Sequence, residues 1–112
     1  MGEVGAEEEA NVFRALADST RRQILEDLRL GELAAGEIAA KFPISGPSIS
    51  RHLSVLKAAG LVRERRAANR IFYSLVEERL ALSVGRFLSA VCPEQAVVRH
   101  RRRRTTRNGE PE

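Results

Sequence analysis

The amino-acid sequence predicts a mainly α-helical domain that carries one small β-hairpin. Apolar residues recur at helical spacing through residues 7–60 and again through residues 77–92. Between these stretches, residues 61–75 are rich in β-branched and aromatic side chains, which is typical of strands. We expect about five helices and a two-stranded hairpin in one domain. The organisation is a flexible acidic N-terminus at residues 1–9, the domain at 10–93 and a disordered basic tail at 94–112.

Three helices are expected before residue 45. The first covers residues 7–17, and the second covers residues 19–30 with Asp18 as its N-cap. Arg21 and Arg22 lie in the first turn of the second helix, where the helix dipole disfavours a positive charge. Either these charges are tolerated on the surface, or an anion such as a phosphate compensates them. The third helix covers residues 35–42 and ends before a proline.

The fourth helix, at residues 45–60, has the most informative pattern in the chain. Its apolar stripe consists of Ile49, Leu53 and Leu56. The other side is short and hydroxylated with one arginine, and comprises Pro47, Ser48, Ser50, Arg51 and Ser54. Small side chains permit close approach to another surface, while Ser and Arg bond to phosphates and base edges. This face suits a DNA groove, although an ordinary solvated helix face is the alternative. Because the connection from the third helix is short, the pair has a helix-turn-helix layout.

The hairpin concentrates positive charge. Residues 61–66 and 70–75 are expected to pair around residues 67–69, and four arginines crowd the tip: Arg63, Arg65, Arg66 and Arg70. The whole chain has 19 Lys and Arg against 15 Asp and Glu, a net charge of +4. Residues 41–70 hold seven basic residues and one acidic residue, Glu64. This local excess indicates polyanion binding, and a wing lying along a DNA backbone accounts for the arginines.

The last expected helix, at residues 77–92, carries a long apolar stripe. Its members are Leu80, Val84, Phe87, Leu88 and Val91. The stripe could pack on the domain's own core, but its length favours contact with a second copy of the chain. A small core of this size would also gain stability from dimerisation.

The sequence resembles the ArsR-type winged helix-turn-helix repressors of bacteria over residues 11–92. The resemblance is carried by Phe-Arg-Ala-Leu-Ala-Asp-Ser-Thr-Arg-Arg-Gln-Ile-Leu at 13–25, Ala-Gly-Glu-Ile-Ala at 35–39, Ser-Ile-Ser-Arg-His-Leu-Ser-Val-Leu-Lys-Ala-Ala-Gly-Leu-Val at 48–62, and Tyr-Ser-Leu at 73–75. It is most similar to the metal-independent, SdpR-like autorepressors.

The resemblance implies a DNA-binding repressor of its own or a neighbouring promoter, with an inverted-repeat operator. The implied homodimer is held by the first and last helices, through Val12, Phe13, Leu16, Leu80, Val84, Phe87, Leu88 and Val91. The candidate DNA-binding residues are Ser45, Pro47, Ser48, Ser50, Arg51, His52, Ser54, Lys57, Arg63, Arg65, Arg66, Asn69 and Arg70. Of these, His52 is expected at the edge of the helix.

The sequence departs from the family pattern at the metal-sensing and wing positions. Metal-sensing members have two cysteines where this chain has Ala34 and Gly36, and residues 77–92 contain no histidine. No metal and no other cofactor are therefore expected. The wing's usual glycine is Ala68, so Asn69 is expected to adopt the left-handed turn conformation.

Other classes of function find little support in the sequence. No nucleophile–base arrangement, phosphate-cradling loop or metal-ligand spacing is present, so we expect no enzyme and no catalytic residue. No apolar run is long enough to span a membrane, and a cytoplasmic, nucleoid-associated protein is expected. Two alternatives stay open: a sensor repressor responding to a ligand or to Cys92 thiol chemistry, and a winged-helix interaction module that does not bind DNA. Cys92 as a small buried hydrophobe is the simpler interpretation.

Overall fold

The computed structural model describes residues 5–92 of the 112-residue chain. It contains five helices and a three-stranded sheet within that part. In chain order the elements are α1 Ala6–Leu16, α2 Ser19–Leu28, β1 Leu33–Ala34, α3 Ala35–Ala39, α4 Gly46–Ala58, β2 Val62–Ala67, β3 Arg70–Leu75 and α5 Glu77–Val91. This confirms the predicted mainly α-helical fold with a β-hairpin. The predicted basic tail at residues 94–112 lies outside the described residues.

The first helix begins earlier than the sequence suggested. Residues 1–9 were expected to be flexible, but α1 starts at Ala6. Three glutamates in its first turn interact favourably with the positive end of the helix dipole. In addition, the Gly5 N–H donates to Glu8 Oε1 at 3.0 Å, which satisfies one of the free donors at the helix start.

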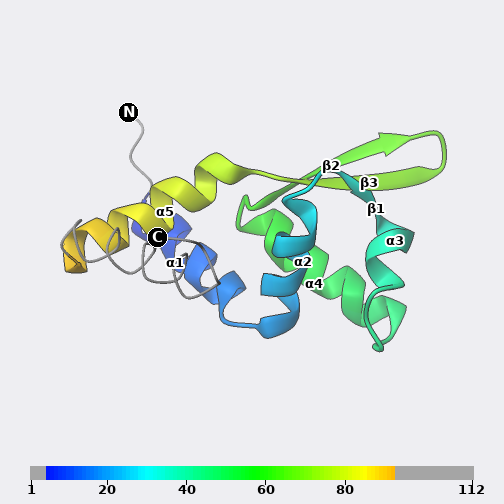
Figure 1. Cartoon of the computed structure of the whole chain (residues 1–112), viewed down its shortest axis with the longest axis horizontal. Helices are drawn as coiled ribbons and strands as arrows, with labels where there is room; N and C mark the ends of the chain where they lie inside the picture. The colour runs from blue at the N-terminus through cyan, green and yellow to red at the C-terminus, as the bar shows by residue number, and fades with distance from the viewer. Residues whose placement is uncertain (1–4, 93–112) are drawn as a thin grey trace, which may run out of the picture.

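The core lies where α1, α2, α3 and α4 meet the base of the hairpin. Its largest fully buried apolar side chains are Val12, Ile24, Ile38, Leu56 and Leu61. Figure 1 shows α1 and α5 at one end of the molecule, while the hairpin extends past α3 at the other end. The apolar faces of α2 and α4 thus pack centrally, which leaves the hairpin and the outer face of α4 available to solvent.

The sheet has one strand more than the predicted hairpin. The strand order is β1-β3-β2, all antiparallel, and β1 pairs through Leu33 opposite Tyr73 and Ala34 opposite Phe72. A two-residue strand shows no alternation of apolar and polar residues, so the sequence pattern could not reveal it. This short pairing attaches the segment before α3 to the hairpin.

The hairpin turn corrects a second expectation. Ala67 pairs with Arg70, so the loop consists of Ala68 and Asn69 alone. Ala68, and not Asn69, has the positive φ angle, at 57°. Two-residue hairpin loops of type II′ require a positive φ at the first loop position, where glycine is the usual residue. The alanine occupies the position that glycine takes in the family.

The structure also explains the two arginines at the start of α2. Arg21 donates from Nε to the Ala15 carbonyl at 2.8 Å and from Nη2 to the Arg14 carbonyl at 3.1 Å. Arg22 Nη1 donates to the Leu16 carbonyl at 2.7 Å. These carbonyls end α1, where the helix dipole is negative and favours cations. The compensating partner is therefore the end of the preceding helix, and no external anion is required.

Candidate nucleic-acid interface

Both ends of α4 are capped, the first by a side chain and the second by backbone hydrogen bonds. The Ser45 side chain accepts a hydrogen bond from the Ser48 N–H at 3.2 Å, and Pro47 occupies the first turn. At the other end, Gly60 has a φ of 77°, its N–H donates to Lys57, and the Leu61 N–H donates to Leu56. These two bonds are those of a Schellman motif. The capping fixes the length and direction of a helix whose outer face is exposed.

The outer face of α4 is free of internal ion pairs at its centre. Ser50, Arg51 and Ser54 are exposed, and no hydrogen bond or ion pair engages the Arg51 side chain within residues 5–92. Ser45 and Ser48 are joined to each other, since Ser45 Oγ donates to Ser48 Oγ at 3.0 Å. The small side chains leave the α4 backbone accessible to a close approach from outside.

His52 lies at the edge of α4, as expected, but it faces inward toward α2. Its Nδ1 is 3.2 Å from Arg21 Nη1 and 3.8 Å from Asp18 Oδ2. The Asp18 carboxylate accepts the Arg21 N–H as an N-cap, and this hydrogen bond holds the pKa of Asp18 below its ordinary value. The geometry makes His52 a link between helices rather than an exposed contact.

The strand register places the wing arginines on two faces of the hairpin. Arg63 pairs with Ser74 and Arg65 with Phe72, whereas Arg66 pairs with Ile71. Since successive side chains of a strand point to opposite sides, Arg63 and Arg65 share one face and Arg66 lies on the other. The arginines that crowd the hairpin tip in the sequence therefore do not form one surface, and Arg66 lies on the face toward α4.

The face that carries Arg65 is stabilised by an aromatic ring and a carboxylate. Arg65 forms a bidentate pair with Glu32, with Nε and Nη2 at 2.9 and 2.7 Å from the two oxygens. Its guanidinium carbon lies 4.6 Å from the centre of the Phe72 ring, and that of Arg70 lies 5.0 Å from the same ring. The hydrogen bond from Arg65 lowers the pKa of Glu32. Arg65 therefore already has an internal partner, which the sequence did not indicate.

A second cluster joins α4 to β2. Lys57 forms an ion pair with Glu64, whose other oxygen lies 3.4 Å from Arg66 Nη2. Hydrogen bonding from Lys57 lowers the pKa of Glu64, and the neighbouring charges of Lys57 and Arg66 act in the same direction. The one acidic residue in the basic segment thus orients two of its cations.

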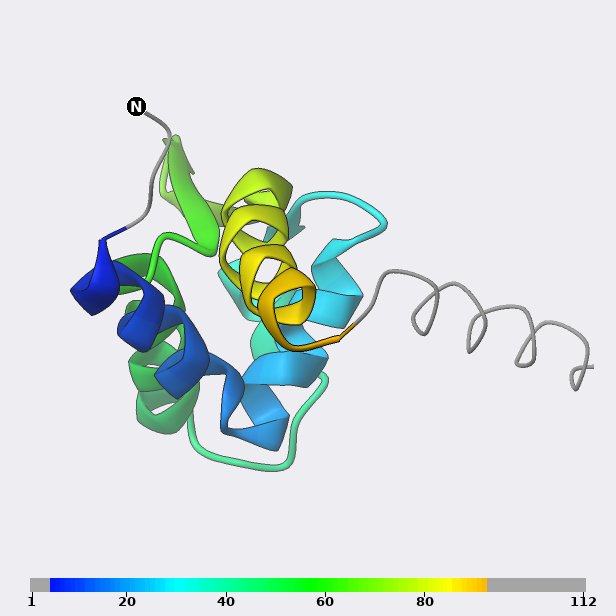
Figure 2. The same ribbon diagram turned by 90° about the vertical axis from the view of Figure 1, so that its left-hand side faces the viewer.

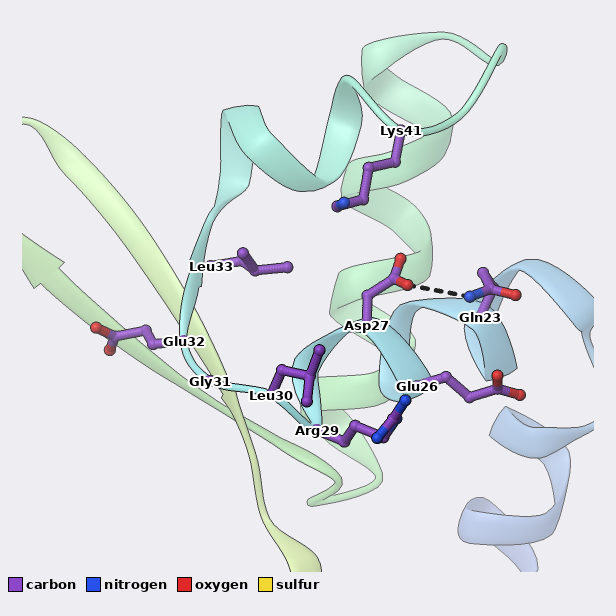
Figure 3. Close-up of a pocket in the computed structure, with 9 residues that line it drawn as sticks. All are labelled: Gln23, Glu26, Asp27, Arg29, Leu30, Gly31, Glu32, Leu33 and Lys41. Carbon is purple, nitrogen blue, oxygen red and sulfur yellow. Dashed lines mark hydrogen bonds between the residues drawn. The ribbon is translucent and has the colours of Figure 1, made fainter. Parts of the chain in front are cut away.

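Two hollows flank this framework, and their charges differ. The first, of about 320 Å³, lies between α2, β1 and α3 and contains both signs: Glu26, Asp27, Arg29, Glu32 and Lys41. In Figure 3, Lys41 points into this space, Gln23 donates to Asp27, and Glu32 turns away toward the strands. The second, which we call the wing-base hollow, measures about 670 Å³ and is predominantly basic. Its lining residues are Lys57, Gly60, Val62, Arg63, Glu64, Arg66, Val76 and Arg79.

Comparison with known proteins places this arrangement in a family. A family described as a helix-turn-helix domain matches residues 16–65. Transcriptional repressor SdpR of Bacillus subtilis (strain 168) is 51% identical over 65 residues, which span 58% of this chain and 72% of that protein. The crystal structure of an ArsR family transcriptional regulator superposes with a TM-score of 0.73 at 27% identity, covering 79% of this chain and 90% of that one. The chain belongs to the ArsR family of winged helix-turn-helix transcriptional regulators.

A further solved relative of this ArsR-family chain bears on assembly. The solution structure of a homodimeric winged helix-turn-helix domain from Mycobacterium bovis has a TM-score of 0.62 at 28% identity, covering 80% of this chain and 91% of that one. Both comparisons cover about four-fifths of this chain.

The ArsR-family chain exposes an apolar strip on α1 and α5. Phe13 and Phe87 contact each other edge to face, with ring centres 5.5 Å apart, and both remain partly exposed. Leu88 and Val91 continue the strip along α5, whereas Leu82, which is 51% exposed and was not indicated by the sequence, lies on the opposite side of that helix. Leu82 does not have the helical spacing of the apolar stripe on α5, so the pattern did not select it.

Some residues predicted for the dimer interface belong to the protomer's own core. Val12 is 0% exposed, so it has no surface left to bury against a second chain, and its assignment to the interface is wrong. Leu16, Leu80 and Val84 are half-buried and pack against the core. The first half of the α5 stripe therefore holds α5 on its own domain.

The ArsR-family chain shows no group of three or more His, Cys, Asp or Glu side chains arranged to hold a metal ion among residues 5–92. Ala34 and Gly36, which the resemblance matches to the cysteines of metal-sensing members, carry no ligand atom on their side chains. In the same part of the chain, no helix is both long enough and apolar enough to cross a lipid bilayer.

Proposed function

We propose that this protein represses transcription as a homodimer that binds an inverted-repeat operator near its own or a neighbouring promoter. The observation that carries the proposal is the outer face of α4. Its central residues Ser50, Arg51 and Ser54 are exposed and unpaired within the described chain, while basic side chains flank them on the hairpin. A capped helix with a small polar face is suited to the major groove.

The remaining basic residues suit positioning contacts. Lys57, Arg63, Arg66 and Arg70 are exposed, and cations of this kind bind phosphates along the backbone. Asn69 is exposed at the hairpin tip, next to Ala68, and is suited to the flanking minor groove. Figure 2 supports this division of contacts, because α4 and the hairpin lie on the same side of the molecule, opposite α2.

The proposed dimer buries the apolar strip of α1 and α5. Exposed Phe13, Phe87 and Val91 would cost solvation free energy in a monomer, and a two-fold contact removes them from water. A homodimeric relative of the same fold supports this arrangement. Two copies of α4 related by a two-fold axis would read half-sites separated by about one helical turn, roughly 34–36 Å.

We also propose that DNA binding requires no metal ion and takes place in the cytoplasm, where the operator DNA lies. Support for the metal-free mode comes from Ala34 and Gly36, which cannot ligate. Treatment of the purified protein with a chelator should leave operator affinity unchanged. A loss that zinc restores would show that metal contributes.

The decisive experiment is a gel-shift titration on upstream DNA from the protein's own gene and from the neighbouring genes, with scrambled duplexes of equal length and composition as control. We expect binding to one upstream duplex to be at least 1,000-fold tighter, since specific and non-specific affinities of such regulators differ by about 10³ or more. Footprinting should reveal two protected half-sites. Equal affinity for all upstream and scrambled duplexes, or no binding, would refute the proposal and favour a protein-interaction module.

A further inference from the structure

The wing-base hollow lies where α4, β2 and α5 meet. It is lined by basic residues of all three elements, namely Lys57 of α4, Arg63 and Arg66 of β2, and Arg79 of α5. Arg79 was not among the residues that the sequence indicated. Because α4 rises about 1.5 Å per residue, Lys57 stands roughly 9 Å along the axis from Arg51. The hollow thus lies beside the C-terminal end of α4, next to the base of the hairpin.

The charges in the hollow are not balanced internally. Its one carboxylate, Glu64, is fully used, since one oxygen pairs with Lys57 and the other lies 3.4 Å from Arg66. No carboxylate pairs with Arg63 or Arg79 within residues 5–92. Because the side chain of Arg63 lies on the other face of β2, three cations, Lys57, Arg66 and Arg79, stand against one anion and leave a net charge of about +2 in a concave site, which concentrates positive potential there. By contrast, the hollow between α2, β1 and α3 carries three acidic and two basic residues.

The guanidinium of Arg79 lies next to the backbone at Gly60. A Cβ at Gly60 would lie 3.1 Å from Arg79 Nε, 3.2 Å from Cζ and 3.4 Å from Nη2. The planar group therefore rests against the glycine in space that any other residue would occupy. Gly60 already needs its positive φ to end α4, so one glycine serves both the helix cap and the placement of the arginine.

We infer that the wing-base hollow binds a phosphate group, with Arg79 as a contact beside Lys57 and Arg66. Arginine presents several N–H donors in a planar fork that matches phosphate oxygens, and lysine adds a point charge. Two sources supply this chemistry: a backbone phosphate of bound DNA, and a free phosphate or phosphate ester. The DNA source rests on the proposed function, whereas the free source does not.

The first arm of the test uses a double-mutant cycle on DNA. Arg79→Gln removes the cation, and a scan of single methylphosphonate substitutions removes the charge of one phosphate at a time from the operator duplex. Arg29→Gln is the matched control, because it removes the same charge from an exposed residue of the other hollow. We expect Arg79→Gln to reduce the slope of log K against log salt by about 1, and Arg29→Gln to leave the slope unchanged. One methylphosphonate position should lose its effect only in the Arg79→Gln protein.

The second arm needs no DNA. Inorganic phosphate is titrated into the full-length protein, and the amide resonances of Gly60 and Arg79 are followed by NMR at constant ionic strength with chloride as control. Saturable shifts in the wild type that are lost in Arg79→Gln would assign the hollow to free phosphate. If Arg79→Gln does not fold, Arg79→Met, which also removes the charge but keeps a long unbranched side chain, replaces it in both arms.

Coupling at one DNA phosphate or a saturable phosphate shift supports the inference and identifies the source. If operator binding is specific but Arg79→Gln behaves like Arg29→Gln, and phosphate causes no saturable shift, the inference is overturned while the proposed function stands. If the wild type binds no DNA, the proposed function fails and the phosphate titration alone decides.

Discussion

Arg21 Nη1 lies 3.2 Å from His52 Nδ1, and the same guanidinium donates to the carbonyls of Ala15 and Arg14. One side chain of α2 thus contacts both the end of α1 and the middle of α4. Since α1 contributes to the proposed dimer surface and α4 to the proposed DNA contact, Arg21 couples the positions of the two.

We expect Arg21→Gln to destabilise the protein by about 1–3 kcal/mol, because two hydrogen bonds from a charged donor to carbonyls at the end of α1 are lost. The matched control is Arg22→Gln, which removes the same charge but only one such bond, at 2.7 Å on the exposed side. Urea denaturation monitored by circular dichroism measures both. An equal loss of unfolding free energy in the two variants would show that the contacts of Arg21 stabilise the fold no more than that of Arg22.

Arg51 is the best candidate for reading a base. We expect Arg51→Ala to cost about 1–3 kcal/mol of operator binding and much less on a scrambled duplex, since a base contact is specific whereas a phosphate contact is not. Fluorescence anisotropy on both duplexes measures the difference. Arg29→Ala, which removes an exposed charge elsewhere, serves as control. A uniform loss on both duplexes would make Arg51 a phosphate contact instead.

The apolar strip predicts a dimer that charge should disrupt. Phe87→Glu combined with Leu88→Glu places two carboxylates on the exposed part of α5, where burying them against a partner would be unfavourable. Light scattering should show a folded monomer with little operator affinity. Leu30→Glu changes an 81% exposed leucine at the end of α2 and should leave the dimer intact. A double variant that remains dimeric would place the interface elsewhere.

The free energy of unfolding should decrease as the pH falls, because ion pairs and hydrogen bonds stabilise the charged form of several carboxylates. Hydrogen bonds from partner groups lower the pKa of four acidic residues, Glu9, Asp18, Glu32 and Glu64. A carboxyl group with a lower pKa in the folded chain binds fewer protons there than in the unfolded chain. The free energy of unfolding is therefore retained above about pH 4.5 and lost as the pH falls through the folded pKa values.

Urea midpoints measured between pH 7 and pH 3 test this expectation. Glu32→Gln removes the bidentate pair with Arg65 and should flatten part of the decline, whereas Glu78→Gln, at an exposed position of α5 without an ion pair in the described chain, should not. A midpoint that rises toward pH 3 would contradict the argument.

The sequence predicted the helices and the hairpin because their patterns are local. The spacing of Ile49, Leu53 and Leu56 and the cap at Ser45 sufficed to place α4, and all three apolar residues are buried. The sequence pattern could not predict contacts between side chains that are far apart in the chain. The hydrogen bond from Arg65 to Glu32 joins two residues that are 33 positions apart in the sequence. The contact of Arg79 with Gly60 brings α5 next to the end of α4. Neither has a periodic signature.

The same reasoning explains the errors at the predicted dimer face. Val12 and Phe13 are adjacent in a helix, so a hydrophobic pattern assigns both to one broad side, yet Val12 is completely buried and Phe13 is exposed. Only the packing of α1 against its neighbours separates them. The DNA-binding assignments remain predictions, since they depend on a partner molecule.

Ser83 provides a test of the packing of α5. It is 0% exposed, lies among residues that pack on the core, and its hydroxyl has no hydrogen-bond partner within residues 5–92. An unpaired buried hydroxyl costs about 1–3 kcal/mol, and alanine has the higher helix propensity. We therefore expect Ser83→Ala to stabilise the protein by about 1–2 kcal/mol in urea denaturation. Ser83→Val, which adds volume at the same site, should instead destabilise it by about 1–3 kcal/mol. Destabilisation by alanine would show that the hydroxyl has a partner in solution, such as an ordered water.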